Sequence, residues 1–178
     1  MDIVLKCNNL LFRKPTQEDV ERLVELKNNK KASKLLGGNT PIYTMEGISK
    51  WVDYHNQNEE EVLLVVYDET AGKLIGHVGL YKIDLLTKKS EFGILLADDD
   101  SRGKGYGTMC TKTLVNYAFD ELGLHKVYVE VISENKASEA MFKKCGFRTD
   151  GILRDDNYKN GVYYDVLTMS ILENERIE

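Results

Sequence analysis

The chain has 178 residues, and its 24 lysines and arginines against 29 aspartates and glutamates give a formal net charge of −5. A chain of this length usually forms one domain, so we expect residues 1–178 to be a single domain. The hydrophobic fraction of 42% is sufficient for a buried core and argues against intrinsic disorder. The acidic balance argues against nucleic-acid binding, which requires a basic surface.

Three further classes are disfavoured. The apolar run over residues 62–66 is much shorter than the roughly 20 residues that cross a bilayer, so we expect no membrane partner. The N-terminus lacks the layout of a secretory signal, and the cysteines, Cys7, Cys110 and Cys145, show no CxxC spacing. These features predict a cytoplasmic protein without disulfides. The three histidines are dispersed, so we expect no metal.

The first half of the chain combines helical and strand patterns. Thr16 is a suitable N-cap, and Val20, Leu23 and Val24 recur after it at helical spacing. A β-meander is then expected, because β-branched segments alternate with polar turns. In chain order we expect a strand over 9–13, a helix that begins after residue 16, a helix over about 45–56, and strands over 61–67, 74–83 and 90–96.

The second half adds a βαβ unit. Apolar residues from Tyr106 to Leu122 follow one helical face, and Gly123 is placed to end that helix. We expect next a strand over 127–132, a helix over 135–145, and a hairpin with a turn at 160–161 and a final strand over 163–172. A meander combined with a βαβ unit predicts an α+β fold, with a mixed central β-sheet flanked by helices.

The segment most indicative of function is residues 102–108, Arg-Gly-Lys-Gly-Tyr-Gly-Thr, between a strand and a helix. The backbone N–H groups at such a helix start point together at the positive end of the helix dipole, which suits a phosphate. Thr108 stands where a dinucleotide-binding motif needs glycine, and the Walker pattern is absent. An ordinary glycine-rich turn is the alternative interpretation.

Several motifs, in order, resemble the GNAT N-acetyltransferase superfamily. Residues 102–107 resemble its Arg/Gln-x-x-Gly-x-Gly/Ala motif, and residues 134–138 and 142–147 resemble its Asn-x-x-Ala/Ser and Gly-Phe segment. Residues 150–154 and 160–165 resemble the closing hairpin of a branch that includes spermidine and ribosomal-protein N-terminal acetyltransferases. The resemblance covers nearly the whole chain and implies the GNAT fold.

The resemblance also implies that acetyl-CoA is the co-substrate. The glycine-rich segment would hold its diphosphate, with direct charge from Arg102 and Lys104, and the strand at residues 94–96 would meet its pantetheine amides. The residues that the resemblance assigns to the cofactor are Ile94, Leu95, Leu96, Arg102, Gly103, Lys104, Gly105, Tyr106, Gly107, Thr108, Asn135, Ser138 and Phe142.

The implied reaction is attack of an amine on a thioester, which needs no metal. A primary amine with a pKa near ~10 is only about 0.1% neutral at pH 7, a deficit of roughly 4 kcal/mol. The resemblance points to Glu91 as the general base, with a surface residue or a lysine partner as the alternative. The family's thiol-protonating tyrosine is replaced by Phe142, and Tyr106 and Tyr128 are substitutes unless they serve packing.

Two other reactive residue types are expected to be structural. Cys145 precedes Gly146-Phe147 at a helix end, which favours a small packed thiol over a nucleophile. His77 lies in an apolar strand between two glycines, which favours a satisfied core residue over a base.

The acceptor is the least determined part. Lys27, Lys30, Lys31 and Lys34 would steer an anionic substrate such as an amino-sugar nucleotide, unless they form a solvated helix face. Acidic side chains would instead attract a polyamine, unless they too are only solvated surface residues. They are Glu46, Asp53, Glu59, Glu60 and Glu61. The resemblance favours a small-molecule amine such as spermidine. A protein N-terminal α-amine, a non-catalytic acyl-CoA sensor and a homo-oligomer are also compatible with it.

Overall fold

The computed structural model describes residues 3–34, 36, 41–101 and 103–176 of the chain. In chain order its helices and strands are β1 (Val4–Cys7), β2 (Leu10–Arg13), α1 (Val20–Lys27), α2 (Lys30–Ser33), α3 (Met45–Gln57), β3 (Val62–Asp68), β4 (Lys73–Asp84), β5 (Lys89–Leu96), α4 (Tyr106–Asp120), β6 (Lys126–Ile132), α5 (Lys136–Lys144), β7 (Arg148–Lys159) and β8 (Val162–Leu172). No helix within these ranges is long and apolar enough to span a membrane.

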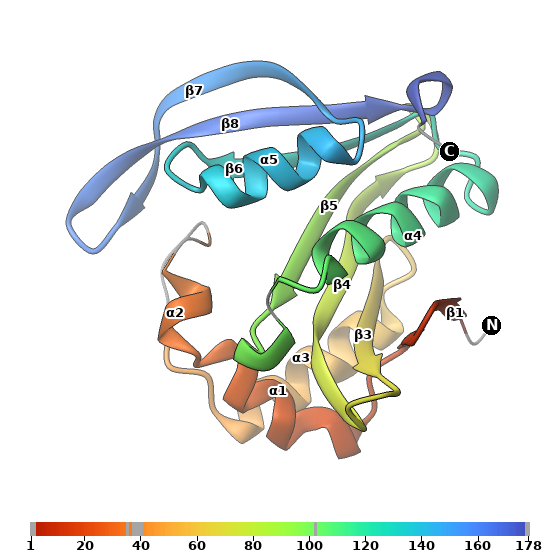
Figure 1. The fold of residues 1–178 in the computed structure, drawn as a ribbon, viewed down its shortest axis with the longest axis vertical. Coiled ribbons are helices and arrows are strands. Elements are labelled where there is room, and N and C mark those ends of the chain that lie inside the picture. Colours follow the sequence, from red (N-terminus) through yellow and green to blue (C-terminus); the bar gives the residue numbers. More distant parts are fainter. Residues whose placement is uncertain (1–2, 35, 37–40, 102, 177–178) are drawn as a thin grey trace.

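The strands form one sheet in the order β1-β2-β3-β4-β5-β6-β8-β7 (Figure 1). Neighbouring strands are antiparallel except β5 and β6, which are parallel because α4 crosses over between them. The expected α+β fold with a mixed sheet is therefore confirmed. The sequence patterns missed β1 and α2, which have only four residues each. Asn29, whose side chain caps α2 by accepting from Lys31 and Ala32, was an available signal.

Helices cover both faces of the sheet. Side chains alternate along β5, so Phe92 faces the core beneath α4, while Leu95 faces the core shared with α1 and α3. The first core contains Leu80 and Leu114, both fully buried. The two layers hold the central strands β3, β4 and β5 firmly, so these strands are a rigid base for a site.

The sheet splits between β5 and β6. Their parallel pairing ends where Glu91 lies beside Tyr128, although β5 runs on to Leu96 and β6 to Ile132 (Figure 1). Along its whole length β6 instead pairs with β8. The second half of β5 thus turns one backbone edge towards an opening rather than towards a neighbouring strand.

Candidate functional site

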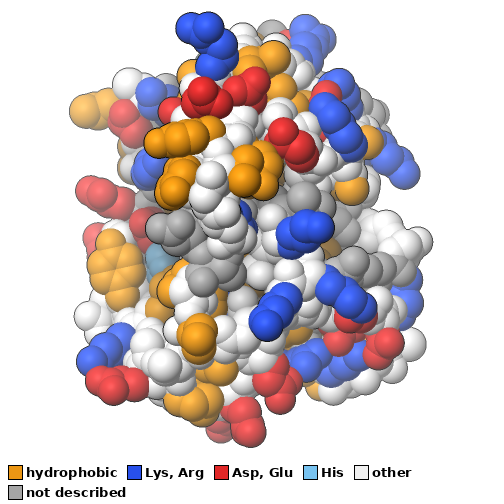
Figure 2. All heavy atoms as spheres, turned by 90° about the vertical axis from the view of Figure 1, so that its left-hand side faces the viewer, with side chains coloured by type: hydrophobic (Ala, Val, Ile, Leu, Met, Phe, Trp, Pro, Cys, Tyr) orange, Lys and Arg blue, Asp and Glu red, His pale blue; other side chains and the backbone are white. Residues whose placement is uncertain are grey.

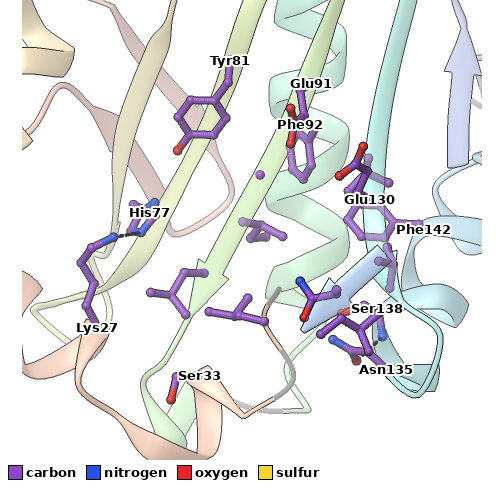
Figure 3. A pocket seen from close by; sticks show the side chains of 18 of the residues that line it. Lys27, Ser33, His77, Tyr81, Glu91, Phe92, Glu130, Asn135, Ser138 and Phe142 are labelled. Carbon is purple, nitrogen blue, oxygen red and sulfur yellow. Dashed lines mark hydrogen bonds between the residues drawn. The ribbon is translucent and has the colours of Figure 1, made fainter. Parts of the chain in front are cut away.

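A cavity of about 500 Å³ lies at this opening (Figure 3). Its walls come from α1, β4, β5, β6, α5 and the end of β7. Six residues predicted from the sequence line it, from both sides of the opening: Glu91, Ile94, Leu95, Asn135, Ser138 and Phe142. The fold thus joins β5, the last strand of the meander, to α5, the helix after β6, in one cavity.

Two opposed glycines shape the floor of the cavity. Gly79 on β4 pairs with Gly93 on β5, and the Tyr81 ring lies over both. A Cβ on Gly79 would come within 2.5 Å of the ring, and one on Gly93 within 2.8 Å. The Tyr81 side chain lines the cavity, and its ring is held against the sheet where side chains are missing. Sequence reasoning overlooked Tyr81; the pattern Gly-x-Tyr opposite a second strand glycine was its signal.

Glu91 lies at one end of the cavity. Its carboxylate contacts the Lys82 ammonium at 2.7 Å, and its side chain is 23% exposed. Lys82 reaches it from a bulge in β4 where its own φ is +51°. Glu91 therefore has the lysine partner that was the alternative expectation, and it faces the cavity as well.

The α5 side of the cavity is a capped helix start followed by an apolar wall. The Asn135 side chain accepts a hydrogen bond from the Ser138 backbone N–H at 3.1 Å and so caps α5. Phe142 is buried and packs edge-on against Phe92, with ring centres 5.8 Å apart. Phe142 offers no hydroxyl, so the acid expected from the resemblance is absent from this position.

The glycine-rich segment forms the start of α4. Gly103 and Gly105 both have φ of +75°, a conformation that glycine adopts readily, and Gly105 is the N-cap. The Met109 N–H bonds back to the Gly105 carbonyl, so the N–H groups of the three preceding residues have no partner within the helix. These groups, on Tyr106, Gly107 and Thr108, are available to an anion.

Other predicted cofactor residues lie outside the main cavity. Gly105 and Thr108 line a second hollow of about 330 Å³. Leu96 is half-buried and packs on the core beneath α4. Gly103 and Lys104 are exposed, and Arg102 lies outside the described residues.

The tyrosines considered as substitute acids are placed elsewhere. The Tyr106 hydroxyl is buried, donates to Asp68 at 2.8 Å and accepts from Asn9 at 2.9 Å. Tyr128 does not line the cavity. Among the described tyrosines, Tyr43 and Tyr81 line it. Burial and the charges of Glu61 and Glu91 raise the pKa of Tyr81, so its hydroxyl stays protonated at neutral pH.

The environment of Lys27 differs from that of the other lysines in the predicted basic run. Its ammonium lies 4.1 Å from the centre of the Trp51 ring and 5.0 Å from that of Tyr43, and its Nζ is 3.3 Å from His77 Nε2. Burial lowers the pKa of Lys27 to about 8. Lys27 lines the cavity, whereas the other three lysines of the run, Lys30, Lys31 and Lys34, are exposed.

His77 is buried, as expected, but its hydrogen bonding is incomplete. It is 7% exposed, and its Nδ1 has no hydrogen-bond partner among the described residues. Burial, together with Lys27 and His55, holds the pKa of His77 well below its usual value, so the ring is neutral. The sequence predicted a core histidine with both ring nitrogens hydrogen-bonded. The prediction of complete hydrogen bonding was wrong, because His77 lines a cavity and is not enclosed in the core.

The acidic residues proposed to attract a polyamine face elsewhere. Glu46 pairs with Lys50 on the outside of α3, and Glu61 contacts His55 Nδ1 at 2.5 Å. Asp53 accepts from Gln17. None of the acidic residues named in that prediction lines the main cavity.

Cys145 is a packed thiol, as expected. It is buried, its Sγ lies 3.9 Å from the Thr108 carbonyl, and burial raises its pKa. A thiol that stays protonated in a core is a poor nucleophile.

A split parallel strand pair beside a glycine-capped helix is the arrangement that the family resemblance implies for an acetyl-CoA-dependent transferase, and known proteins agree. A family model described as an acetyltransferase (GNAT) domain matches residues 9–148. The spermidine N(1)-acetyltransferase of Vibrio cholerae serotype O1 is 31% identical over 135 residues, covering 76% of this chain and 77% of that protein. The putative ribosomal N-acetyltransferase YdaF of Bacillus subtilis (strain 168) is 32% identical over 166 residues, covering 89% and 88%.

A solved structure is also similar over nearly all of the chain. The crystal structure of spermidine N-acetyltransferase from Vibrio cholerae in complex with CoA and spermine has a TM-score of 0.86 at 28% identity, covering 95% of this chain and 98% of that chain. This chain belongs to the GNAT acetyltransferase family. It is an N-acetyltransferase that uses acetyl-CoA as its co-substrate.

Proposed function

We propose that this N-acetyltransferase acetylates a primary amine of a small molecule bound in the cavity between α1, β4 and β5. The observation that carries the proposal is the division of that cavity. One wall holds Asn135, Ser138 and Phe142, the residues the family resemblance assigns to the cofactor, and the other holds Lys27, His77 and Tyr81. One cavity thus has room for a thioester on one side and for an amine on the other, which aligns the two reactants.

The residues present fit acetyl-CoA. The unbonded N–H groups at the start of α4 suit its diphosphate, because they lie at the positive end of the helix dipole. The open edge of β5 at residues 94–96 suits the amides of its pantetheine arm. The same edge offers N–H donors to the thioester oxygen as negative charge develops there. Phe142 supplies an apolar wall.

Glu91 and Tyr81 are the groups we propose for proton transfer. We propose that Glu91, which lines the cavity and contacts Lys82, accepts the proton of the incoming amine. We propose that the Tyr81 hydroxyl, whose side chain lines the same cavity, donates a proton to the leaving thiolate in place of the family tyrosine. The two residues are paired across β4 and β5 and lie on the same face.

Three acceptor classes are to be compared. Two of the relatives described above are named for spermidine, which supports a polyamine. The cavity itself supports an amine with a negatively charged group, because Lys27 lines it and the predicted acidic residues do not. A protein N-terminal α-amine is a third acceptor that the relative YdaF makes worth testing.

The deciding experiment is a thiol-release assay with acetyl-CoA and a panel of polyamines, amino sugars, amino-sugar nucleotides and peptides with free N-termini. We expect amine-dependent release of CoA and an acetylated small molecule identified by mass spectrometry. Binding of acetyl-CoA in calorimetry without thiol release from any amine would contradict the proposal and would favour an acyl-CoA sensor. Turnover confined to peptides would move the acceptor to proteins.

A further inference from the structure

We propose that the amine acceptor carries an anionic group, a phosphate or a carboxylate, and that Lys27 and His77 bind it. This inference rests on the proposed function, because it concerns the acceptor of the same cavity. Lys27 comes from the last turn of α1 and His77 from the middle of β4, and both line the cavity wall opposite α5.

The first argument is the unbalanced charge of Lys27. Within the described ranges, its ammonium contacts two aromatic rings and one histidine nitrogen, and no carboxylate pairs with it. Lys82, the neighbour of Glu91, has such a partner at 2.7 Å. A partly buried cation without a counter-charge is unfavourable, and an anion from outside is the missing partner.

The second argument is the proton on His77. A protonated Lys27 has no lone pair, so in the 3.3 Å contact it donates to His77 Nε2. The neutral ring then carries its hydrogen on Nδ1, which is buried without an acceptor in the described part of the chain. The ring N–H lacks an acceptor, and the ammonium keeps two N–H groups besides the one that it gives to Nε2. These donors match the several lone pairs of a phosphate or carboxylate.

The third argument is that a second cation is disfavoured here. Trp51 and Tyr43 offer ring faces of the kind that bind ammonium groups, but the Lys27 ammonium already lies against both. An ammonium of a polyamine would meet Lys27 at close range and would be repelled.

The charges at the other end of the cavity give the acceptor a direction. Glu91, paired with Lys82, and the exposed Glu130 lie at the end away from Lys27 (Figure 3). Lys159, which also lines the cavity, already donates to the Ser33 and Leu36 carbonyls. The acceptor would therefore place its amine near Glu91 and its anion near Lys27. Figure 2 shows hydrophobic, basic and acidic side chains intermixed on the face that includes α2 and the β7–β8 hairpin, with a histidine visible at its left side.

The test uses amines that differ only in the charged group. Cadaverine and free lysine differ by a carboxylate, while glucosamine and glucosamine 1-phosphate differ by a phosphate, so the two pairs separate the two anions. We expect kcat/KM to be at least about tenfold higher for the anionic member of one pair. In the Lys27→Gln variant, the ratio of kcat/KM between the anionic member of that pair and the member without the anion should fall towards one. In the Lys30→Gln variant, which removes an exposed lysine, the ratio should stay as in the wild type. Equal or lower kcat/KM for both anionic members, or an unchanged preference in Lys27→Gln, would overturn the inference.

A binding measurement separates this inference from the proposed function. If no amine supports thiol release, the proposed function fails, and calorimetry of glucosamine 1-phosphate with the CoA-loaded protein then decides. Binding that Lys27→Gln weakens at least about tenfold supports the anion site, and absence of binding overturns it. Equal acetyl-CoA affinity in the two lysine variants shows that both are folded. If Lys27→Gln does not fold, the wild-type preference within the pairs decides alone.

Discussion

The Tyr81 ring covers two glycines that face each other across β4 and β5, and this contact fixes one hydroxyl at the cavity. A side chain on either glycine would displace the ring. The same face of the sheet carries His77 and Glu91 at the neighbouring positions, so one strand pair presents three groups able to exchange protons. At the residue scale the chemistry depends on this alternation of glycine and functional side chain.

Tyr81→Phe tests the proposed acid. Removing the hydroxyl keeps the ring in place, so we expect kcat to fall by roughly 10²-fold with little change in acetyl-CoA affinity. Since the pKa of Tyr81 is raised, wild-type kcat should show no loss from its ionisation up to about pH 10. Steady-state kinetics against pH are the measurement. Tyr54→Phe, on the exposed outside of α3, is the matched control, and equal rates in both variants would remove Tyr81 from this role.

Glu91→Gln tests the proposed base. The amide keeps the shape of the side chain but cannot accept the proton, so kcat should fall and the acidic limb of the pH profile should be lost. Glu121→Gln changes an exposed carboxylate at the end of α4, outside the cavity, and should leave both unchanged. A pH profile of Glu91→Gln identical to that of the wild type would exclude Glu91 as the base.

Lys27 makes stability depend on pH in a predictable direction. Burial lowers its pKa to about 8, below the 10.5 of an unburied lysine, so between these values the unfolded chain binds more protons than the folded one. Stability from this group therefore rises as the pH increases from about 8 towards 10.5 and is absent below that window. Lys27→Met removes the charge, so its unfolding free energy should exceed that of the wild type. This difference should be smaller at pH 10 than at pH 7 in denaturant titrations. A constant difference would contradict the burial of the charge.

At the scale of elements, two features place the cofactor side of the site. Pairing of β6 with β8 along its whole length draws it away from β5, and α4 begins with a left-handed glycine. The first exposes a strand edge, and the second exposes N–H groups. Neither feature depends on a particular side chain, which is why backbone geometry dominates this half of the site.

Gly105→Glu tests the helix start. The negative side chain would stand beside the N–H groups proposed for the diphosphate, so acetyl-CoA affinity should drop at least about 100-fold in calorimetry. Gly123→Glu is the matched control, because Gly123 also has positive φ, has open space around it and lies just beyond the other end of α4. Both variants should lose a similar ~1 kcal/mol of stability from backbone strain. Equal acetyl-CoA affinity in the two variants would rule out a diphosphate site there.

At the scale of the molecule, the C-terminal hairpin is tied to the N-terminal segment. Lys159, at the end of β7, is 4% exposed and donates to the backbone carbonyls of Ser33 and Leu36. This contact closes the cavity between α2 and the hairpin, segments far apart in the sequence. The acceptor half of the site therefore depends on the complete chain.

Lys159→Met should loosen this closure. The Leu36 carbonyl would lose its donor, and the Ser33 carbonyl would keep only the Leu36 N–H. The cost is about 1–3 kcal/mol, so the midpoint of thermal unfolding should fall by several degrees. We expect a higher KM for the amine and unchanged acetyl-CoA affinity. Lys143→Met, on the exposed side of α5, is the control and should show neither change. A thermal midpoint equal to that of the control would contradict a structural role for the tie.

Much of the fold was predictable because its signals are local. Alternation and helical spacing identified most strands and helices, and Gly123 and Gly146 marked helix ends. The residues proposed for the cofactor could be named from the sequence, because most of them belong to a short contiguous motif at a helix start. The acceptor side was not: Lys27, His77 and Tyr81 are separated in sequence and resemble surface or core residues until they are placed together.

The sequence by itself determined the family, the mixed sheet and the glycine-rich helix start, because each is encoded by neighbouring residues and backbone preferences. Its net charge of −5 argued against a general polyanion binder but did not identify the acceptor. Only the tertiary structure decided which charges face the cavity. Burial against Trp51 separates Lys27 from three exposed lysines of the same run, and pairing turns the acidic side chains elsewhere. The interaction between a side-chain charge and a substrate depends on their separation in space, and the packing of distant segments sets that separation.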